Sequence, residues 1–360
     1  MTPFILPPLP PAADIETKAI LKAVIPARAA LAELKTGGRI IPDDSLLITN
    51  LTLLEAKDSS EIENIFTTHD ALFRADALPN KAVDLNVKEV QRYRAALWHG
   101  VESIRRKPLA TNTFVELFQR IKETDAGIRT TTGTRIADGH GNTIYTPPEG
   151  EETIRTLLAN LETFLHADNG IDPLIKMAVG HYQFEAIHPF TDGNGRTGRI
   201  INILYLLQED LLDTPVLFLS RYIIEHKADY YRLLKEVTEQ GAWEAWVLYM
   251  LKAVEVTSRE TIERIHAISD ALQTLQTDMR EHTPKIYSKD FVELLFSSPY
   301  IRIHDVVEAG IAKGRITAGR YLQTLAAAGL LVQQRLGKET IYLNMPLITI
   351  LAGKNTPVQK

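Results

Sequence analysis

The sequence predicts a mainly α-helical protein with one short β-hairpin in its middle and a small module of helices and strands at its C-terminal end. Three observations support this fold class. Apolar residues recur at helical intervals along most of the chain. A single interval, residues 127–150, breaks this period and is rich in threonine and glycine. Beyond residue 282 the pattern changes again and predicts three short helices followed by two short strands.

The composition is that of an ordinary globular protein, with 45% hydrophobic and 24% charged residues among 360. A chain of this length favours two or three domains over a single core. Its formal charge of −5 argues against a protein whose whole surface binds nucleic acid. The absence of cysteine excludes disulfides and thiolate metal sites. No basic leader opens the chain and no stretch approaches the about 20 apolar residues of a membrane span, so we expect a cytoplasmic protein without a membrane segment.

Several helices and their ends are expected from residue patterns. The first helix covers residues 17–35, with Pro26 as a break, and a longer one begins with Asn86 as its N-cap. Asp172 can cap a later helix whose first position is Pro173, where proline is tolerated best. The expected helices before the C-terminal module include residues 17–35, 86–106, 111–123, 150–167 and 172–187.

The interval of residues 127–150 is expected to form two short strands around the turn at residues 138–142, DGHGN. Pro147 would stop the second strand. An unstructured loop is the alternative, because glycine and threonine are also common in loops.

The C-terminal module, residues 282–360, is expected to be a winged helix-turn-helix domain, because three helices followed by a hairpin is the element order of that fold. Residues 314–331 would form its recognition helix and residues 335–340 the tip of its wing. Between residues 285 and 345 eight basic residues outnumber five acidic ones, a net charge of +3. That excess suits DNA phosphates, but it also fits a module that docks on protein or dimerises, so both kinds of partner stay open.

The segment Gly193–Gly198, GNGRTG, matches G-x-G-x-x-G, the fingerprint of dinucleotide-binding folds. That fingerprint requires a strand before its first glycine. The residues that precede Gly193 have helical spacing instead, so a dinucleotide-binding fold is excluded.

Two Glu-x-x-His pairs, Glu185–His188 and Glu263–His266, have the spacing of ligands in di-iron helical bundles. Pro189 places His188 at a helix end, whereas such a ligand projects inward from the middle of a helix. The second pair fits a solvated helix face. A di-iron centre is therefore not expected.

The stretch from His188 to Arg199 combines the parts of an anion site with a base. A glycine-rich loop that leads into a helix presents free N–H groups and the positive end of the helix dipole to a phosphate, and its glycines allow positive φ and close approach. Arg196 and Arg199 are neighbours on that helix and can bind phosphate oxygens. Asp192 would repel a phosphate unless Mg²⁺ lies between them, and His188 can act as a general base. A connecting loop with solvated arginines is the alternative.

The twelve residues His188–Arg199, HPFTDGNGRTGR, resemble the signature of the Fic (filamentation induced by cAMP) family at every position. With the surrounding helices and the expected hairpin, the resemblance covers roughly residues 107–253. It implies a helical core with a hairpin flap, whose exposed edge would pair with the backbone of a target protein. It also implies the activity of most members, the transfer of AMP from ATP to a protein hydroxyl.

The resemblance further implies roles for single residues. His188 would deprotonate the incoming Ser, Thr or Tyr hydroxyl, Asp192 would hold Mg²⁺ against the α- and β-phosphates, and Arg199 would reach the γ-phosphate. Tyr231 is favoured over Tyr230 as the residue beside adenine, with core aromatic residues as the alternative for both. The complete ATP site would comprise His188, Gly193, Asn194, Gly195, Arg196, Thr197, Gly198, Arg199 and Tyr231.

Two other positions of the motif add to this expectation. Phe190 would be buried in the core and fix the loop. Death-on-curing relatives, which phosphorylate their targets, carry lysine where this chain has Gly195. The glycine leaves room for the β- and γ-phosphates of ATP, which favours AMP transfer over phosphorylation.

Ser59, Glu63 and Asn64 resemble the inhibitory motif of the family, in which Ser or Thr is followed four residues later by Glu and then by Gly or Asn. The resemblance implies that Glu63 pairs with Arg199 and keeps the γ-phosphate from its productive place. A capping box that starts a helix at Ser60 is the purely structural alternative. The same glutamate could instead position water, so an enzyme that also removes AMP stays open.

Four consecutive parts are therefore expected: an N-terminal helical region with the inhibitory helix (1–106), the Fic core (107–253), a connecting helix (254–281) and the winged helix (282–360). The expected partners are ATP, Mg²⁺, a target protein with a hydroxyl side chain, and a second copy of the chain. A DNA-binding regulator with a nucleotide-sensing domain is the competing function. His188 favours the enzyme, because a sensor needs the anion loop but no base.

Overall fold

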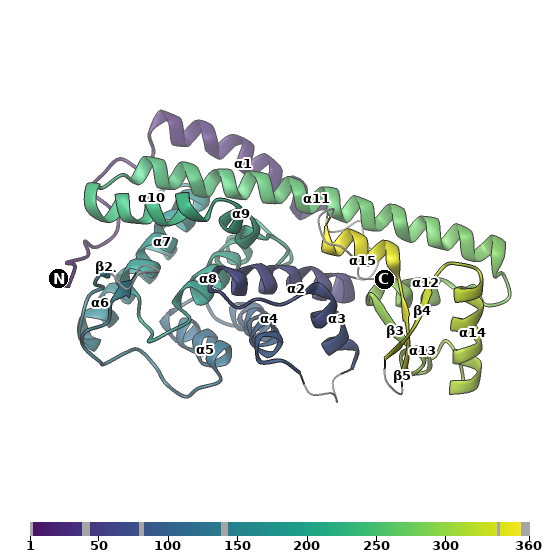
Figure 1. Cartoon of the computed structure of the whole chain (residues 1–360). Helices are drawn as coiled ribbons and strands as arrows, with labels where there is room; N and C mark the ends of the chain where they lie inside the picture. The colour runs from purple at the N-terminus through teal and green to yellow at the C-terminus, as the bar shows by residue number, and fades with distance from the viewer. Residues whose placement is uncertain (1–2, 38–43, 79–82, 138–142, 337–338, 354–360) are drawn as a thin grey trace. The chain divides into compact units, whose positions relative to one another are not determined.

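Helices dominate the computed structural model, which describes residues 3–37, 44–78, 83–137, 143–336 and 339–353 (Figure 1). The mainly helical fold class predicted from the sequence is confirmed. None of the helices in these ranges is both long enough and apolar enough to span a lipid bilayer.

The helices are α1 (Lys18–Gly37), α2 (Asp44–Ile62), α3 (His69–Ala77), α4 (Leu85–Ile104), α5 (Thr111–Lys122), α6 (Glu151–His166), α7 (Pro173–Ile187), α8 (Asn194–Gln208), α9 (Leu219–Glu225), α10 (Lys227–Gln240), α11 (Trp243–His282), α12 (Lys289–Ser297), α13 (Ile303–Glu308), α14 (Arg315–Ala327) and α15 (Met345–Ala352). The strands are β1 (Ile136–Ala137), β2 (Thr143–Tyr145), β3 (Tyr300–Arg302), β4 (Val332–Leu336) and β5 (Glu339–Leu343).

Two compact units divide these elements, and each draws on segments that are not consecutive. The first comprises Met1–Lys35, Glu55–Phe66 and Lys88–Arg259. The second comprises Thr36–Leu54, Thr67–Val87 and Glu260–Lys360. The first unit thus combines part of the N-terminal region with the expected Fic core. The four consecutive parts expected from the sequence stay a prediction.

Helix α7 forms the centre of the first unit. Thirteen of its fifteen residues are buried, so it is apolar on nearly every face and enclosed by other helices. Trp246 of α11 donates a hydrogen bond from Nε1 to the carbonyl oxygen of Ala178, at 2.7 Å. His181 Nε2 lies 2.9 Å from the hydroxyl of Tyr230 on α10. These buried contacts fix α7, and with it the loop that follows residue 187.

The predicted ends of the helices are partly confirmed. Asp172 caps α7 through Leu174 N, and Pro173 is its first residue, as expected. Pro26 lies within α1 and does not break it. A proline at this position leaves the carbonyl group of Lys22 without its helical partner, and because Lys22 is exposed, water can satisfy that group. Asn86 is not an N-cap, because α4 begins one residue earlier and Asp84 Oδ1 accepts the hydrogen bond from Asn86 N at 2.7 Å.

The predicted hairpin in the middle of the chain is confirmed as a two-stranded antiparallel ribbon, so the alternative of an unstructured loop is wrong for its strands. Ile136 pairs with Tyr145 and Ala137 with Thr143, with an irregularity between the two pairs. The turn DGHGN, residues 138–142, lies outside the described residues.

The second unit contains a three-stranded antiparallel sheet in the order β3-β5-β4. The three expected helices, α12, α13 and α14, precede the expected hairpin β4–β5, while β3 and the final helix α15 were not foreseen. Residues 337–338 at the expected wing tip lie outside the described residues. Helix α3 also belongs to this unit: Tyr300 on β3 donates its hydroxyl hydrogen bond to Asp70 and meets Phe73 edge-on. That this module is a winged helix stays a prediction.

Candidate functional site

The loop between α7 and α8 contains the predicted histidine and the glycine-rich motif. His188 ends α7 with a left-handed backbone, φ 48°, and its N–H donates to the carbonyl oxygen of Phe184. Gly193 precedes α8 with φ 73°, a conformation that glycine adopts without strain. A histidine at positive φ is uncommon, and such backbone geometry concentrates at functional sites.

Interactions within the motif fix this loop. The ring of Phe190 stacks on Phe118 with a centroid separation of 4.3 Å, which places it in the core as predicted. Asn194 Oδ1 accepts from Phe190 N and Asn194 Nδ2 donates to Phe190 O, both at 2.8 Å. Thr197 donates from Oγ1 to Gly193 O at 2.9 Å. The side chain of Asn194 therefore holds the loop, which leaves the phosphate role proposed for this residue to its main chain.

The three glycines of the motif serve different needs. Only Gly193 has a positive φ, whereas Gly195 and Gly198 lie within α8 and are required for space. A Cβ atom on Gly195 would lie 2.3 Å from Glu63 Oε1. A Cβ atom on Gly198 would lie 2.6 Å from Glu185 Oε1. The motif is thus adapted to close approach of two carboxylates as well as to an anion.

Arg199 is buried and binds the end of α2. Its Nε donates to Ser59 Oγ at 2.8 Å, and its Nη2 donates to Ser59 O at 2.9 Å and to Glu63 Oε1 at 2.8 Å. Burial alone would lower the pKa of Arg199, but Glu63 and other nearby acidic groups outweigh it, so the pKa is raised. The structure therefore brings Ser59 and Glu63 to Arg199, from which they lie 140 and 136 positions away in the sequence.

The end of α2 explains the spacing of the expected inhibitory motif. The helix runs to Ile62, so Ser60 lies in its last turn and the alternative of a capping box that starts a helix is wrong. Asn64 follows with φ 62° and donates from its N–H to Glu61 O. Asparagine tolerates this left-handed conformation better than most residues. Asn64 thus terminates the helix at the point where Glu63 faces Arg199.

Arg196 is paired with a residue that the sequence did not reveal. Its guanidinium is buried, and Nη1 lies 2.6 Å from Glu89 Oε2 on α4. Its Nε is buried without a hydrogen-bond partner among the described residues. Both arginines of the motif therefore contact a glutamate from a preceding helix, and neither is the solvated side chain of a simple connecting loop.

Asp192, the predicted metal ligand, is exposed and pairs with Lys122, whose Nζ lies 2.6 Å from Asp192 Oδ2. Burial acts to raise the pKa of this carboxyl, but Lys122 and the N–H of Gly193 outweigh it, so the pKa is lowered. Across the described ranges, three or more His, Asp or Glu side chains nowhere gather in a way that could hold a metal ion. One ionised carboxylate still suits Mg²⁺ that takes its other ligands from phosphates and water.

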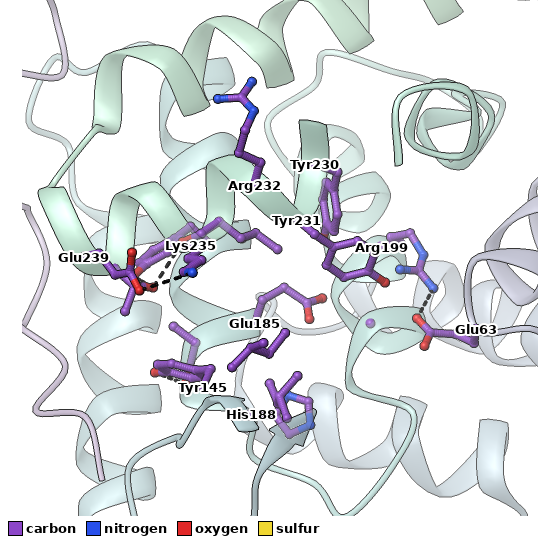
Figure 2. Close-up of a pocket in the computed structure, with 17 residues that line it drawn as sticks. Glu63, Tyr145, Glu185, His188, Arg199, Tyr230, Tyr231, Arg232, Lys235 and Glu239 are labelled. Atoms are coloured by element: carbon purple, nitrogen blue, oxygen red, sulfur yellow. Dashed lines mark hydrogen bonds and ion pairs between the residues drawn. The ribbon is translucent and has the colours of Figure 1, made fainter. Parts of the chain in front are cut away.

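A cavity of about 480 Å³ opens beside the loop (Figure 2). Its size is that of a small-molecule site. Tyr231 is 42% exposed, whereas Tyr230 is only 2% exposed, which distinguishes the two tyrosines considered for adenine. The residues that line it are Glu63, Ile136, Ile144, Tyr145, Tyr182, Glu185, Ala186, His188, Gly195, Arg199, Tyr230, Tyr231, Arg232, Leu234, Lys235, Thr238 and Glu239.

His188 is electrostatically suited to stay neutral. Burial and the charge of Arg129 lower its pKa to about 4, against the opposing effects of a backbone hydrogen bond at Glu185 and the carboxylates of Glu63 and Asp192. The imidazole is therefore unprotonated near pH 7 and able to accept a proton. Glu185, on the same wall of the cavity, has a pKa raised to about 7 by burial.

Four charged residues at this site escaped the sequence prediction: Glu89, Lys122, Arg129 and Glu185. Glu185 had been considered only as a metal ligand. The other three lie 59 to 107 positions from the motif residues that they contact, and single charged residues in amphipathic segments look like surface residues. Their roles follow from tertiary contacts that local spacing does not encode.

Three family models match this chain. The model described as Fic/DOC family N-terminal matches residues 21–102, and the Fic/DOC family model matches residues 109–206. The C-terminal domain of SoFic-like protein adenylyltransferases matches residues 272–347. Together they cover the expected inhibitory motif, the HPFTDGNGRTGR motif and most of the C-terminal module.

Two curated relatives each match part of this chain. Protein adenylyltransferase fic-1 of Caenorhabditis elegans is 30% identical over 125 residues, 34% of this chain and 23% of the relative. A probable protein adenylyltransferase of Aquifex aeolicus is 26% identical over 182 residues, 48% of this chain and 53% of the relative. The chain thus spans about a quarter to a half of the length of these relatives.

Solved structures share the fold at low identity. A Fic family protein from Desulfovibrio desulfuricans aligns with a TM-score of 0.55 at 20% identity, over 91% of this chain and 96% of that chain. Fic-1 from C. elegans aligns with a TM-score of 0.53 at 22% identity, over 69% and 73%.

Proposed function

The chain belongs to the Fic/DOC family, and from this premise we propose that it transfers AMP from ATP to a hydroxyl group of a target protein. One observation carries the proposal: neutral His188 lines the same cavity as Gly195 and Arg199 at the start of α8. A base, a helix N-terminus that can bind an anion and a cavity large enough for a small molecule are the three parts that this reaction needs.

The transfer would proceed by attack of the target hydroxyl oxygen on the α-phosphorus of ATP. The bond from that phosphorus to the oxygen shared with the β-phosphate breaks, and pyrophosphate leaves. His188 takes the hydroxyl proton. Negative charges of bound ATP would raise the pKa of His188 above its value of about 4 in the free protein, towards the range where a general base is most effective.

The positive groups of the motif would bind the phosphates. The N–H groups at the start of α8 and the side chain of Arg196 face the loop, and Arg199 would bind the γ-phosphate once it is free of Glu63. Tyr231, exposed on the cavity wall and edge-on to Tyr230, would contact adenine. Bound Mg²⁺, held by Asp192, would neutralise charge on the α- and β-phosphates. For that, Lys122 has to release the carboxylate it now binds.

Glu63 would act as an inhibitor of this reaction. Its carboxylate binds the guanidinium that the γ-phosphate needs, and it lies against Gly195, where the phosphate chain would pass. Bound ATP and Glu63 would therefore compete for Arg199. Activation requires only that the end of α2 move or that Glu63 be removed.

The experiment uses the Glu63→Gly variant, in which this competition is absent. The variant is incubated with Mg²⁺, a cell extract as a source of targets, and ATP labelled at either the α- or the γ-phosphate. Relative to the same extract without the variant, we expect added protein-bound label from the α-phosphate and none from the γ-phosphate, which protein kinases of the extract also transfer. Added label from the γ-phosphate would show phosphorylation instead. No label, although ATP binds, would favour a nucleotide-sensing protein and contradict the proposal.

A further inference from the structure

The last turn of α7 and the residue after His188 are held by Arg129, which precedes the β1–β2 hairpin, and by Tyr145 of β2. Within the described part of the chain, four successive carbonyl groups, Ala186 to Pro189, accept hydrogen bonds from these two residues. Tyr145 Oη donates to Ala186 O at 2.8 Å. Arg129 donates from Nη2 to Ile187 O at 3.4 Å, from Nε to His188 O at 2.8 Å, and from its main-chain N–H to Pro189 O at 2.9 Å.

The carbonyl groups of Ala186 and Ile187 are among those that a helix end leaves without intrahelical partners, and those of His188 and Pro189 follow directly after the helix. A water molecule or a neutral side chain could satisfy them. The chain uses instead a guanidinium that is only 3% exposed and whose pKa burial lowers. Arg129 Nη2 also donates to Pro148 O, on the far side of the hairpin. One planar cation thus joins residues 129, 148 and 187–188 in a single network.

We propose that Arg129 is a positioning residue, which fixes the left-handed turn at His188 to both ends of the hairpin and so sets the orientation of the base relative to the strand that a target would pair with. The inference rests on the proposed function, because it assigns the orientation of His188 a role in transfer. Arg129 itself touches neither ATP nor the hydroxyl in this account.

A second consequence of the same geometry is electrostatic. The groups that face His188 are Arg129, Glu185 on α7, Asp192 on the loop and Glu63 directly after α2. Among them Arg129 carries the positive charge that disfavours a protonated imidazole. The residue that orients His188 therefore also adds to the effect of burial, the larger cause of its lowered pKa, and an uncharged helix cap would not do so.

The test compares Arg129→Met and Arg129→Lys, with Arg135→Met as the matched control, since Arg135 is an exposed arginine of the same flanking segment. The pKa of His188 is measured by NMR on histidine-labelled protein without ATP or Mg²⁺. This readout does not depend on any activity. The kcat and KM of transfer are measured separately, in the Glu63→Gly background.

We expect Arg129→Met to raise the pKa of His188 by about 1 unit and to lower kcat about 10- to 100-fold with little change in the KM for ATP. Arg129→Lys keeps the positive charge but lacks the planar guanidinium that binds several carbonyl groups at once. The pKa of His188 should therefore stay near that of the wild type, while kcat still falls. Arg135→Met should change neither quantity.

An unchanged pKa and an unchanged kcat in folded Arg129→Met would overturn the inference. If that variant does not fold, Arg129→Lys decides: full kcat there would overturn it as well. If the Glu63→Gly background itself transfers no AMP, the proposed function fails, whereas the pKa measurement still tests whether Arg129 controls His188.

Discussion

Two regions meet at Arg199, and they are built in opposite ways. The loop from His188 to Arg199 is fixed by buried contacts: Phe190 is in the core, and both ends of the Asn194 amide bind its main chain. Arg129 also holds the carbonyl group of His188. The end of α2 reaches the site through buried Ser59, which binds Arg199 with its hydroxyl and its carbonyl oxygen, and through Glu63 just beyond the helix, whose side chain is 33% exposed and held by one ion pair. The loop is thus a fixed scaffold, whereas the Glu63 carboxylate is a removable contact at its edge.

The difference indicates where the proposed function would separate catalysis from control. Changes in the loop should damage transfer or stability, because its contacts are internal and buried. Changes at Glu63 should leave the fold intact and alter only how often Arg199 is available for a phosphate. The predictions that follow test this separation, in order of decreasing expected effect.

The largest effect is expected when His188 is replaced by alanine in the Glu63→Gly background. Loss of a general base lowers rates by about 100- to 10,000-fold. The rate of protein labelling from α-labelled ATP measures it, and the thermal midpoint checks that the variant is folded. Residual activity within about threefold of the parent would assign the base to another residue.

Asn194→Ala should destabilise the protein by about 2–4 kcal/mol, because the buried N–H and carbonyl groups of Phe190 both lose their partner. Urea unfolding measures the change. Asn64→Gly provides the contrast: Asn64 is exposed and has φ 62°, so glycine there should change stability by only a few tenths of a kcal/mol. Equal losses at the two asparagines would contradict the distinction between scaffold and removable region.

Glu63→Gln should speed AMP transfer about 10- to 100-fold, since a charged hydrogen bond to buried Arg199 contributes roughly 1.5–3 kcal/mol. Pyrophosphate release in the presence of a target measures the rate. Glu61→Gln is the matched control, because Glu61 lies in the same helical turn and binds Lys57. A similar acceleration in the control would indicate a general loosening of α2 rather than release of Arg199.

The smallest effect concerns Glu55, two turns before Glu63 on α2. Its buried carboxyl accepts from Tyr93 Oη at 3.2 Å and from Ser220 N at 3.2 Å, and burial raises its pKa to about 8. In the unfolded chain the pKa is about 4.5. Between these two pKa values the folded state therefore binds one proton more than the unfolded chain. The stability that this proton contributes is lost as the pH rises through 8.

Glu55→Gln should remove this part of the pH dependence. Between pH 6 and pH 8 we expect the wild type to lose about 1–2 kcal/mol relative to the variant, measured by urea unfolding at each pH. Parallel stability profiles would show that Glu55 is ionised in the folded protein throughout this range.

Much of the site was predictable from the sequence because its chemistry is concentrated in one short segment. The motif from His188 to Arg199 contains the proposed base, the glycines and the helix start proposed to bind phosphate, and Ser59-x-x-x-Glu63 was sufficient to propose a partner for Arg199. The buried place of Phe190 followed from the same motif.

The remainder depends on tertiary contacts. Three contacts join segments that are distant in the sequence: Lys122 with Asp192, Glu89 with Arg196, and Arg129 with the carbonyl group of His188. The local patterns of these segments give no sign of pairing. The start of α4 was misplaced for a related reason: either Asp84 or Asn86 could serve as a cap, and the choice depends on the path of the chain before the helix.

The most direct test of the account measures AMP transfer from α-labelled ATP in four proteins: the wild type, Glu63→Gly, His188→Ala and the double variant. The account predicts label in Glu63→Gly at about 10- to 100-fold the wild-type rate, and a double variant as inactive as His188→Ala alone. A Glu63→Gly variant no faster than the wild type, or a double variant that retains its label, would contradict it.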